Sequence, residues 1–495
     1  MHSQSTSSLR LPENSVGSTP QLKPLCVDLD GTLLKTDALV EGILAIISSP
    51  GALVKIPQLL VTTRASLKQR VAELSNLDPA LLPYNRDVLD YVDREKRRGR
   101  PIVLVTAADQ RIAHAISDHL GIFDEVIASD GNRNLKGEEK ASELVRRYGR
   151  QGYDYVGNDR TDLPAWREAD SIIMVDTSTS VASAARAAGN IAAEFCHDSS
   201  FVKSALRAMR PHQWVKNVLV FVPLLAAQSL TDASGFLGAL MMFVAFCASA
   251  SAIYLINDLL DLAADRSHPH KKNRPFASGT LALTSGAVLA TALLGLGIAL
   301  SVATGSVAIL LAYATISLAY SVALKCYPLL DVFILALLYT LRIIAGGIAS
   351  GHLVTLWLLA FSGFTFLSLA LVKRTGELML LQSSAVAGAN LRRGYEPADI
   401  GSLQMFGVAS AFASSVVLAL FVNRVAELQQ YRSPEILWGL VPLILFWQLR
   451  LWLSTQRGHM HDDPIVYAAR DWVSWLVAIG ACILLLLASQ NVRLW

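Results

Sequence analysis

The chain has 495 residues, of which 53% are hydrophobic, and a formal net charge of +3 at pH 7. This length is far too great for one domain, and the small net charge says little because its distribution along the chain matters more. Five cysteines, an odd number without metal-ligand spacing, argue against a disulfide framework, so we expect reduced, mostly buried thiols in a protein that faces the cytoplasm. They are Cys26, Cys196, Cys247, Cys326 and Cys482.

The composition changes along the chain. Residues 1–22 are polar and contain no apolar core, which predicts a disordered tail rather than a signal peptide. Charged residues are interspersed up to about Arg207, as in a soluble protein, whereas apolar runs of spanning length dominate from about Trp214. We therefore predict a soluble domain over 23–200 and a membrane domain over 201–495.

The soluble part alternates strand-like and helical segments, which predicts an α/β domain with a parallel, Rossmann-like sheet. A helical insert over about 38–98 follows the first strand. Its apolar stretch 42–63 is interrupted at Pro50 and carries Lys55, so a packed helical cap is favoured over a membrane span. The strand-like runs are 25–30, 101–107, 124–129, 153–157 and 171–176.

The membrane part contains nine runs long and apolar enough to predict spans, and hence an all-α polytopic bundle. These runs are 215–230, 236–256, 282–303, 306–323, 329–349, 353–371, 403–422, 436–454 and 472–489.

The connectors between these runs differ in charge. Those after the second, fourth, sixth and eighth runs are basic, whereas those after the first, third and fifth contain no Lys or Arg. Arg424 and Arg432, after the seventh run, are a mild exception. The positive-inside rule predicts a multi-pass protein of the bacterial inner membrane, with the soluble domain and the basic connectors in the cytoplasm.

An acid-rich turn follows the first strand-like run. DLDGTLLKTD places Asp28 and Asp30 after a strand, where one carboxylate can attack phosphorus and the other can transfer the leaving-group proton. Gly31 permits the tight turn that brings backbone amides near a phosphate. Thr106, Lys140 and the loop GNDRTD follow later strands in that order.

Together these elements resemble the haloacid dehalogenase (HAD) superfamily over about 25–193. The resemblance implies Asp28 as nucleophile, Asp30 as general acid/base, Thr106 as phosphate ligand and Lys140, or its rival Lys136, as the charge-stabilising amine. It also implies Mg²⁺, bound by Asp28, Asp30, Asn158 and Asp159. An aspartate is usual where Asn158 stands, so this sequence departs from the pattern at the metal loop.

A second acidic cluster ends the second apolar run, in NDLLDLAAD. Asn257, Asp258, Asp261 and Asp265 are spaced to share one helix face. Carboxylates at the mouth of a membrane helix are costly unless a cation neutralises them, and this donor set suits Mg²⁺, which binds phosphate oxygens in turn. Basic residues follow at once, which indicates a diphosphate site at a membrane surface: Lys271, Lys272 and Arg274.

NDLLDLAAD and the following KNRP resemble the first aspartate-rich motif of the UbiA family of intramembrane prenyltransferases, over about 209–495. That family usually carries a second aspartate pair after a later span. Here Asp331 is present, but Leu335 stands four residues on. This departure resembles the decaprenyl-phosphate phosphoribosyltransferase-like branch, which uses 5-phosphoribosyl-1-diphosphate and a polyprenyl phosphate.

On that resemblance, the Asp258 and Asp261 carboxylates hold Mg²⁺ on the donor diphosphate, and cations elsewhere steer the anionic substrates. The segment MRPHQWVKN could equally be an interfacial anchor. His459 and His461 lie too close together for a metal site, and anion contact or a surface role remains open. The candidate substrate ligands are Arg210, Lys216, Asn217, Lys271, Lys272, Arg274, Tyr320, Lys325, Arg342, Lys373 and Arg374.

Two other functions remain open. An aromatic prenyltransferase that uses polyprenyl diphosphate would need the second aspartate pair. A transporter or scaffold with a cytoplasmic phosphatase domain would place its acids in mid-span rather than at one end. No nucleic-acid partner is expected, and the HAD-like domain is expected to remove the 5-phosphate of the transferase product.

Overall fold

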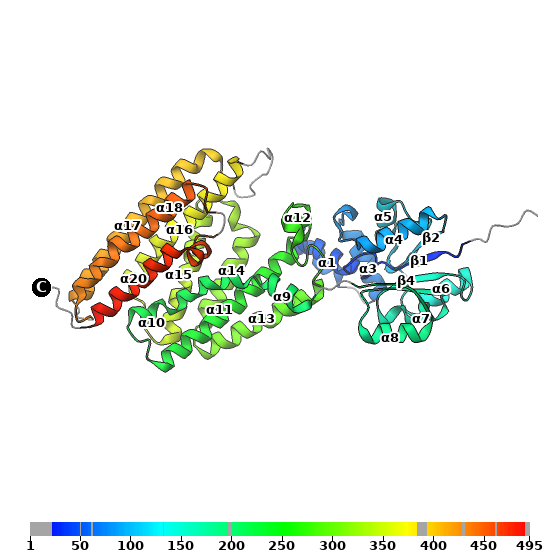
Figure 1. Ribbon diagram of the computed structural model, residues 1–495, viewed down its shortest axis with the longest axis horizontal. Coiled ribbons are helices and arrows are strands. Elements are labelled where there is room, and N and C mark those ends of the chain that lie inside the picture. The colour runs from blue at the N-terminus through cyan, green and yellow to red at the C-terminus, as the bar shows by residue number, and fades with distance from the viewer. Residues whose placement is uncertain are drawn as a thin grey trace, which may run out of the picture. The chain divides into compact units, whose positions relative to one another are not determined.

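The computed structural model describes residues 22–49, 51–60, 63–131, 133–196, 200–383, 394–427, 431–460 and 463–490. The tail predicted for 1–22 therefore lies outside the described residues, apart from Leu22. The chain divides into two compact units, coloured from blue to green and from green to red in Figure 1. The first comprises 1–199, 263–273 and 277–283, and the second comprises 200–262, 274–276 and 284–495.

The first unit is built on a sheet of six parallel strands in the order β3-β2-β1-β4-β5-β6. The predicted parallel α/β domain is thus confirmed, and each predicted strand is present. The edge strand β6 was not predicted, because its residues alternate between half-buried and exposed and include small alanines. The strands are β1 (Leu25–Val27), β2 (Ile102–Asp109), β3 (Glu125–Ser129), β4 (Asp154–Gly157), β5 (Ser171–Val175) and β6 (Asn190–Phe195).

Helices cover the sheet after each of the strands β2 to β5. They are amphipathic and bury one apolar face, as expected for crossover connections between parallel strands. Their bounds are α5 (Gln110–Leu120), α6 (Glu138–Tyr148), α7 (Leu163–Glu168) and α8 (Thr179–Ala188).

The helical insert after β1 is also present. Its apolar helix ends at Ser48 after eleven residues, which is too short to cross a membrane. The last helix of the predicted insert packs on the sheet through Val88 and Val92, so this part of the insert belongs to the same hydrophobic cluster as the strands. The helices are α1 (Ala38–Ser48), α2 (Ala52–Lys55), α3 (Arg64–Leu74) and α4 (Arg86–Arg97).

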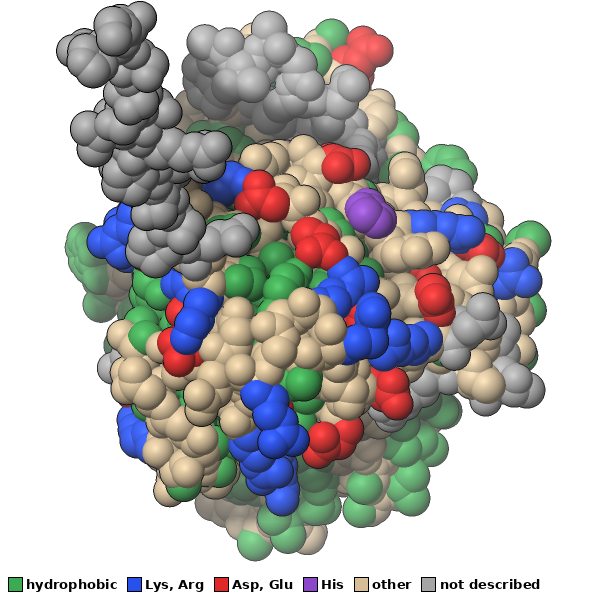
Figure 2. All heavy atoms as spheres, turned by 90° about the vertical axis from the view of Figure 1, so that its right-hand side faces the viewer, with side chains coloured by type: hydrophobic (Ala, Val, Ile, Leu, Met, Phe, Trp, Pro, Cys, Tyr) green, Lys and Arg blue, Asp and Glu red, His purple; other side chains and the backbone are tan. Residues whose placement is uncertain are grey.

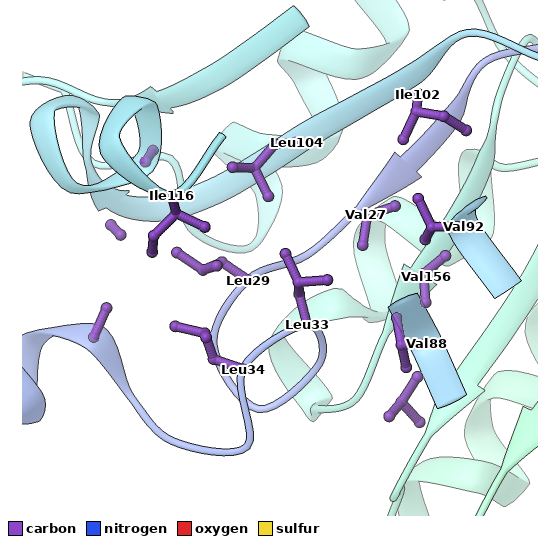
Figure 3. Close-up of a cluster of buried hydrophobic side chains, with 14 of the residues drawn as sticks. Val27, Leu29, Leu33, Leu34, Val88, Val92, Ile102, Leu104, Ile116 and Val156 are labelled. Atoms are coloured by element: carbon purple, nitrogen blue, oxygen red, sulfur yellow. The ribbon is translucent and has the colours of Figure 1, made fainter. Parts of the chain in front are cut away.

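The first unit has two hydrophobic clusters, one between α4, α5 and the central strands and the other between α6, α7, α8 and these strands. Figure 3 shows Val27, Ile102 and Val156 from neighbouring strands facing Val88 and Val92. On the face of the molecule shown in Figure 2, where this unit is turned to the viewer, Lys and Arg side chains are interspersed with Asp and Glu. This mixture is typical of a water-exposed surface.

The first unit also includes α12 (Leu262–Ser267) from Ala263 on. Arg266 donates to both carboxylate oxygens of Glu41, at 3.0 and 2.6 Å, and Thr36 donates to the same carboxylate. All three side chains are nearly inaccessible to solvent, so this bidentate pair is a fixed contact within the unit.

The second unit is helical. Among the residues that the structure describes, seven helices are long and apolar enough to cross a membrane, so seven of the nine predicted spans are confirmed. They are α11 (Ala233–Leu260), α13 (Leu283–Ala303), α15 (Leu330–Ser350), α16 (Leu356–Ser383), α17 (Ile400–Glu427) with the preceding η7 (Pro397–Asp399), α18 (Leu440–Gln456) with the preceding η8 (Pro434–Gly439), and α20 (Trp472–Ser489).

The other two predicted spans differ. The run 215–230 is a 3₁₀ segment, η4 (Pro211–Phe221), followed by the short α10 (Val222–Ala226). Pro211 and Pro223 lie in the first turns of these elements, where the missing N–H of proline is tolerated. In the interior of a longer helix the same prolines would break the hydrogen-bond pattern. The run 306–323 forms α14 (Val307–Val322), an apolar helix whose 16 residues make it shorter than each of the seven segments of spanning length.

Two glycines allow backbones of the second unit to approach closely. A Cβ on Gly346 of α15 would lie 2.0 Å from the carbonyl oxygen of Val220 in η4, and one on Gly238 of α11 would lie 2.0 Å from that of Ala349. Small residues at such crossings are typical of helices packed in membranes. Gly346 therefore sets how near η4 lies to α15.

The cysteine prediction was partly wrong. Cys26 and Cys247 are buried, but Cys196, Cys326 and Cys482 are exposed, and all five are free thiols. Cys482 is exposed on the surface of the apolar helix α20. A residue on the surface of a membrane bundle is not necessarily in contact with water.

We expect Leu104→Ala to destabilise the first unit by about 2–5 kcal/mol, because Leu104 is fully buried beside Ile116 and the truncation leaves a cavity. The measurement is hydrogen exchange of the β1 and β2 peptides in the full-length protein. Val54→Ala, at a side chain 72% exposed, is the control. Equal exchange in the two variants would contradict the assignment of this core.

Candidate active sites

The first candidate site lies at the carboxyl end of β1, the strand between β2 and β4. The Asp28 amide donates to the carbonyl of Val156 on β4 at 3.0 Å, which holds the turn against the neighbouring strand. Lys140 Nζ donates to Asp28 Oδ1 at 2.6 Å, and Thr32 Oγ1 to Asp28 Oδ2 at 3.4 Å. Asp28 is therefore joined to α6, which begins two residues before Lys140.

Lys140, rather than Lys136, meets the acidic turn. Its ammonium also donates to Tyr155 Oη at 2.8 Å and lies 3.5 Å from Asp162 Oδ1, whereas Lys136 is exposed. Burial alone would lower the pKa of Lys140, but the Asp28 and Asp162 carboxylates raise it overall. The amine is therefore held charged beside Asp28.

Asp30 and Thr106 lie at the same edge. Asp30 Oδ1 accepts a hydrogen bond of 2.7 Å from the Ala38 amide at the start of α1, and burial together with the nearby Asp37 raises the pKa of Asp30 to about 7. Burial also raises the pKa of Asp28 against the pull of the Lys140 ammonium. Thr106 is fully buried and accepts from the Ala108 amide at 2.9 Å.

The loop GNDRTD is organised by its last residue. Asp162 Oδ2 accepts from the amides of Asn158 and Asp159 at 3.0 and 3.1 Å. Asn158 lies close to Gly31 (φ +76°), because a Cβ added to Gly31 would be 2.1 Å from the side-chain nitrogen Nδ2 of Asn158. Asn158 thus lies beside the acidic turn, whereas Asp159 is exposed.

Two side chains at this site were missed. Lys68 of α3 donates to the Ala107 carbonyl at 2.5 Å and to Asn134 Oδ1 at 2.8 Å, which brings the helical insert to the end of β2. Tyr155 connects Lys140 to Asp162, donating at 3.0 Å. Neither position could be predicted from the sequence, because Lys68 lies in a polar helix and Tyr155 lies inside a buried strand.

The second candidate site contains the acidic motif at the end of α11. Asp258 is 4% exposed, and its Oδ1 accepts from Arg210 at 2.6 Å and from Arg274 at 3.1 Å. Arg210 has a left-handed backbone (φ +54°), uncommon for a side chain that is not glycine, and its guanidinium stacks 5.0 Å from the Tyr254 ring. Two cations thus converge on one buried carboxylate.

The other members of the motif are arranged differently. Asn257 donates to Ser321 Oγ at 2.9 Å, and Asp261 ends α11. Asp265 is buried in α12, within the first unit. In the described part of the chain no three His, Cys, Asp or Glu side chains gather as a metal cluster, although the amide and carboxylate oxygens of Asn257, Asp258 and Asp261 are the donors that Mg²⁺ prefers.

A cavity of ≈280 Å³ opens beside Arg210 in the second unit. Its wall is more polar than apolar, and it carries three cations, of which Lys216 comes from η4, Lys373 from α16 and Arg210 from the residue before η4, together with two acids. Its polar lining is Arg210, Gln213, Lys216, Tyr254, Lys373, Glu377 and Asp463, of which Arg210, Lys216 and Lys373 are among the ligands predicted from the sequence.

Asp463 connects the cations of this cavity. Its Oδ2 accepts from Lys216 Nζ at 2.8 Å and from Lys373 Nζ at 3.2 Å, and Tyr339 Oη lies 3.2 Å from Oδ1. Burial raises the pKa of Asp463, but the two ammonium groups outweigh it and hold that pKa well below its usual range. The carboxylate is therefore ionised and shared.

Asn217 and Arg342 form a closed network behind the cavity. Arg342 Nε donates to Asn217 Oδ1 at 2.8 Å and Nη2 donates to Tyr313 Oη at 3.1 Å, while Nη1 donates to the Leu338 carbonyl. The guanidinium also lies 5.5 Å from the Phe246 ring. Arg342 is 6% exposed, so it supports the cavity wall.

Arg374 is not placed as a free substrate ligand. It forms a fully buried ion pair with Asp331 and a second one with Glu377, and Tyr395 Oη donates to Asp331 at 2.5 Å. Lys373 and Arg374 were predicted in a connector, but α16 continues to Ser383 and contains both. The single acid of the second motif region is thus occupied by an internal cation.

The remaining predicted ligands lie elsewhere. Tyr320 accepts from Arg374 at 3.5 Å, and Lys325 is half-buried in η6 (Leu324–Cys326). Lys271 and Lys272 are exposed within the first unit. His459 is exposed, whereas His461 lies outside the described residues.

Comparisons with known proteins give the family. The model of the UbiA prenyltransferase family matches residues 218–461, and that of the haloacid dehalogenase-like hydrolases matches 61–167, a range that includes Thr106 and Lys140 but not Asp28. The chain belongs to the UbiA prenyltransferase family and carries a HAD-like domain at its N-terminus. It is an enzyme of the UbiA transferase type.

Two relatives and one solved structure are similar to this chain. The uncharacterized protein y4nM of Sinorhizobium fredii is 39% identical over 93% of this chain and 89% of its own. The decaprenyl-phosphate phosphoribosyltransferase of Mycolicibacterium smegmatis is 32% identical over 57% of this chain and 93% of its own. A UbiA homolog from Archaeoglobus fulgidus bound to GPP and Mg²⁺ covers 57% of this chain and 99% of its own, at 16% identity and a TM-score of 0.45.

We expect Arg374→Met to destabilise the second unit by about 3–5 kcal/mol, because it leaves the Asp331 carboxylate buried without its guanidinium. Adding Asp331→Asn removes the orphaned charge and should restore much of the loss. The measurement is the thermal unfolding midpoint of the full-length protein in detergent.

Arg457→Met, at an exposed arginine after α18, is the matched control for this experiment. An Arg374→Met variant with an unchanged midpoint but weaker binding of inorganic diphosphate would instead make Arg374 a substrate ligand.

Proposed function

We propose that the membrane domain transfers 5-phosphoribose from 5-phosphoribosyl-1-diphosphate to a polyprenyl phosphate, giving polyprenyl-phosphoryl-5-phosphoribose and diphosphate. The observation that carries this proposal is the position of Arg210, which binds Asp258 of the acidic motif and also lines the cationic cavity. A diphosphate site and a second anion site would thus share one residue. The relatives named decaprenyl-phosphate phosphoribosyltransferase support the same substrates.

The reaction needs little covalent chemistry from the protein. An oxygen of the acceptor phosphate attacks C1 of the ribose, a new C1–O bond forms, and the diphosphate leaves with the electron pair of the broken C1–O bond. The acceptor oxygen is already ionised near neutral pH, so no side chain has to remove a proton. Positioning and charge stabilisation would supply the rate enhancement.

The residues divide between the two anions. Arg210 and Arg274, beside Asp258, would stabilise the departing diphosphate, and Lys216 and Lys373 would bind the other phosphate group. Mg²⁺ held by oxygens of Asn257, Asp258 and Asp261 would neutralise part of the diphosphate charge.

The proposed location is the bacterial inner membrane. The basic connectors after alternate spans support a cytoplasmic position for both domains, because positive connectors remain on that side. A soluble, charged donor would then reach the cavity from the cytoplasm.

The HAD-like domain is proposed to remove the 5-phosphate from the transferred ribose. Asp28 would attack the phosphorus, Asp30 would protonate the leaving oxygen and Lys140 would stabilise the phosphate charge. The ion pair of Asp28 with Lys140 and the raised pKa of Asp30 support these roles. The exposed Asp159 and the neighbouring Asn158 would complete a Mg²⁺ site with both aspartates.

We expect Asp258→Ala and Asp261→Ala to lower transfer by at least about 100-fold, because the diphosphate loses its main charge-organising group. Membranes are supplied with polyprenyl phosphate and labelled 5-phosphoribosyl-1-diphosphate, and labelled lipid is counted. Unchanged hydrolysis of a phosphate ester by the HAD-like domain is the folding control. Labelled product from prenyl diphosphate and 4-hydroxybenzoate instead would favour an aromatic prenyltransferase.

We expect Asp28→Asn to make the 5-phosphorylated lipid accumulate without slowing transfer, because only the nucleophile of the second reaction is lost. Mass spectrometry of the lipid product distinguishes the two species. If wild type and Asp28→Asn both yield only the phosphorylated lipid, the HAD-like domain does not act on this product.

A further inference from the structure

The cavity of the membrane domain contains one carboxylate that is already fully engaged. Asp463 accepts from Lys216, Lys373 and Tyr339, and its Oδ1 also accepts from the Ile465 amide at 3.2 Å. Its side chain is 5% exposed. With four donors on two oxygens, Asp463 has little capacity left for a substrate.

The lysines around it are the groups that face a ligand. Both ammonium groups bind the same oxygen, Asp463 Oδ2, although they belong to η4 and α16. Without that carboxylate, two like charges would lie side by side in a poorly hydrated cavity and would repel each other. The carboxylate therefore offsets this repulsion and fixes where the two ammonium groups lie.

Lys216 is the more sensitive of the two. Burial lowers the pKa of Lys216 to about 8, although the Asp463 carboxylate opposes that shift. Loss of the carboxylate would lower this pKa further, so a larger fraction of the amine would be uncharged above neutral pH. The charged and titratable groups that face Lys216 or share its cavity are Asp463, Lys373, Arg342, Tyr339, Tyr254, Arg210 and Glu377.

We propose that Asp463 is a positioning residue that holds Lys216 and Lys373 together as a two-lysine site for a phosphate group. This rests on the proposed function for the identity of the substrate but not for the binding of an anion. Asp463 itself does not contact the ligand.

The position of Asp463 permits a clean substitution. It is the N-cap of α19 (Pro464–Arg470), and asparagine caps helices as well as aspartate does. Asp463→Asn thus removes the charge and keeps the cap and the shape. The matched control is Asp471→Asn, at the N-cap of α20, because Asp471 binds Arg450 outside the cavity.

The experiment measures binding of inorganic phosphate to the full-length protein in detergent between pH 6 and 9, by isothermal titration calorimetry. Affinities are expressed relative to wild type at each pH, which cancels the titration of the ligand. We expect Asp463→Asn to bind within about 3-fold of wild type at pH 6, where both lysines stay charged. At pH 8 it should bind about 5-fold more weakly, because a one-unit fall in the pKa of Lys216 lowers its charged fraction at that pH from about one half to about one tenth.

A second variant tests the cause. Adding Lys216→Arg to Asp463→Asn introduces a cation that does not titrate, and should remove the extra loss at pH 8. Asp471→Asn should follow wild type at every pH. An Asp463→Asn variant that binds equally weakly at all pH values, or like wild type at all of them, would overturn the proposal, as would a wild type that binds no phosphate.

The same proteins are then assayed for transfer to polyprenyl phosphate. If Asp463→Asn shows the expected pH-dependent binding but wild type catalyses no transfer, the proposed reaction is wrong and the two-lysine site is retained. If wild type catalyses transfer but the binding by Asp463→Asn does not depend on pH, the proposed reaction is retained and the two-lysine site is wrong.

Discussion

Charged side chains inside an apolar helical bundle must find partners within the protein, because lipid supplies none. The second unit meets this requirement with two acids that are each bound by two cations and with one cation that is bound by two acids. Asp258 binds Arg210 and Arg274, Asp463 binds Lys216 and Lys373, and Arg374 lies between Asp331 and Glu377. These ion pairs hold together the helices that carry their partners, because separating the helices would leave buried charges without a neutralising partner.

The pairs differ in accessibility, and this difference separates support from function. Asp331 and Arg374 are both 0% exposed, so no ligand can replace either partner without unfolding the contact. Arg210 and Lys373 remain 24% and 28% exposed beside a cavity. The residues best suited to bind an anion are thus those whose internal partner is buried but whose own side chain is not.

Local patterns predicted much of this architecture. Alternating strands and helices gave the parallel sheet, and seven apolar runs gave helices of spanning length. The residues of the acidic turn and of NDLLDLAAD are read directly from short motifs. The Lys216–Asp463 contact joins positions 247 residues apart, and Tyr339 and Tyr254 enter the site from helices that look merely apolar. No local pattern contains such pairings, since only the packing of the bundle creates them. The 3₁₀ geometry of η4 was missed for a related reason, because hydropathy records length but not the hydrogen bonds that two prolines remove.

The close approach at Gly346 gives one backbone position control over chemistry that it never touches. Since η4 carries both Lys216 and Asn217, the absence of a side chain on α15 determines how deep these two groups lie in the bundle. A methyl group there would act as a wedge, moving a lysine away from its carboxylate while every charge in the protein stayed the same. The position of Lys216 in the site thus depends on the space left by the missing side chain of Gly346 rather than on any polar residue.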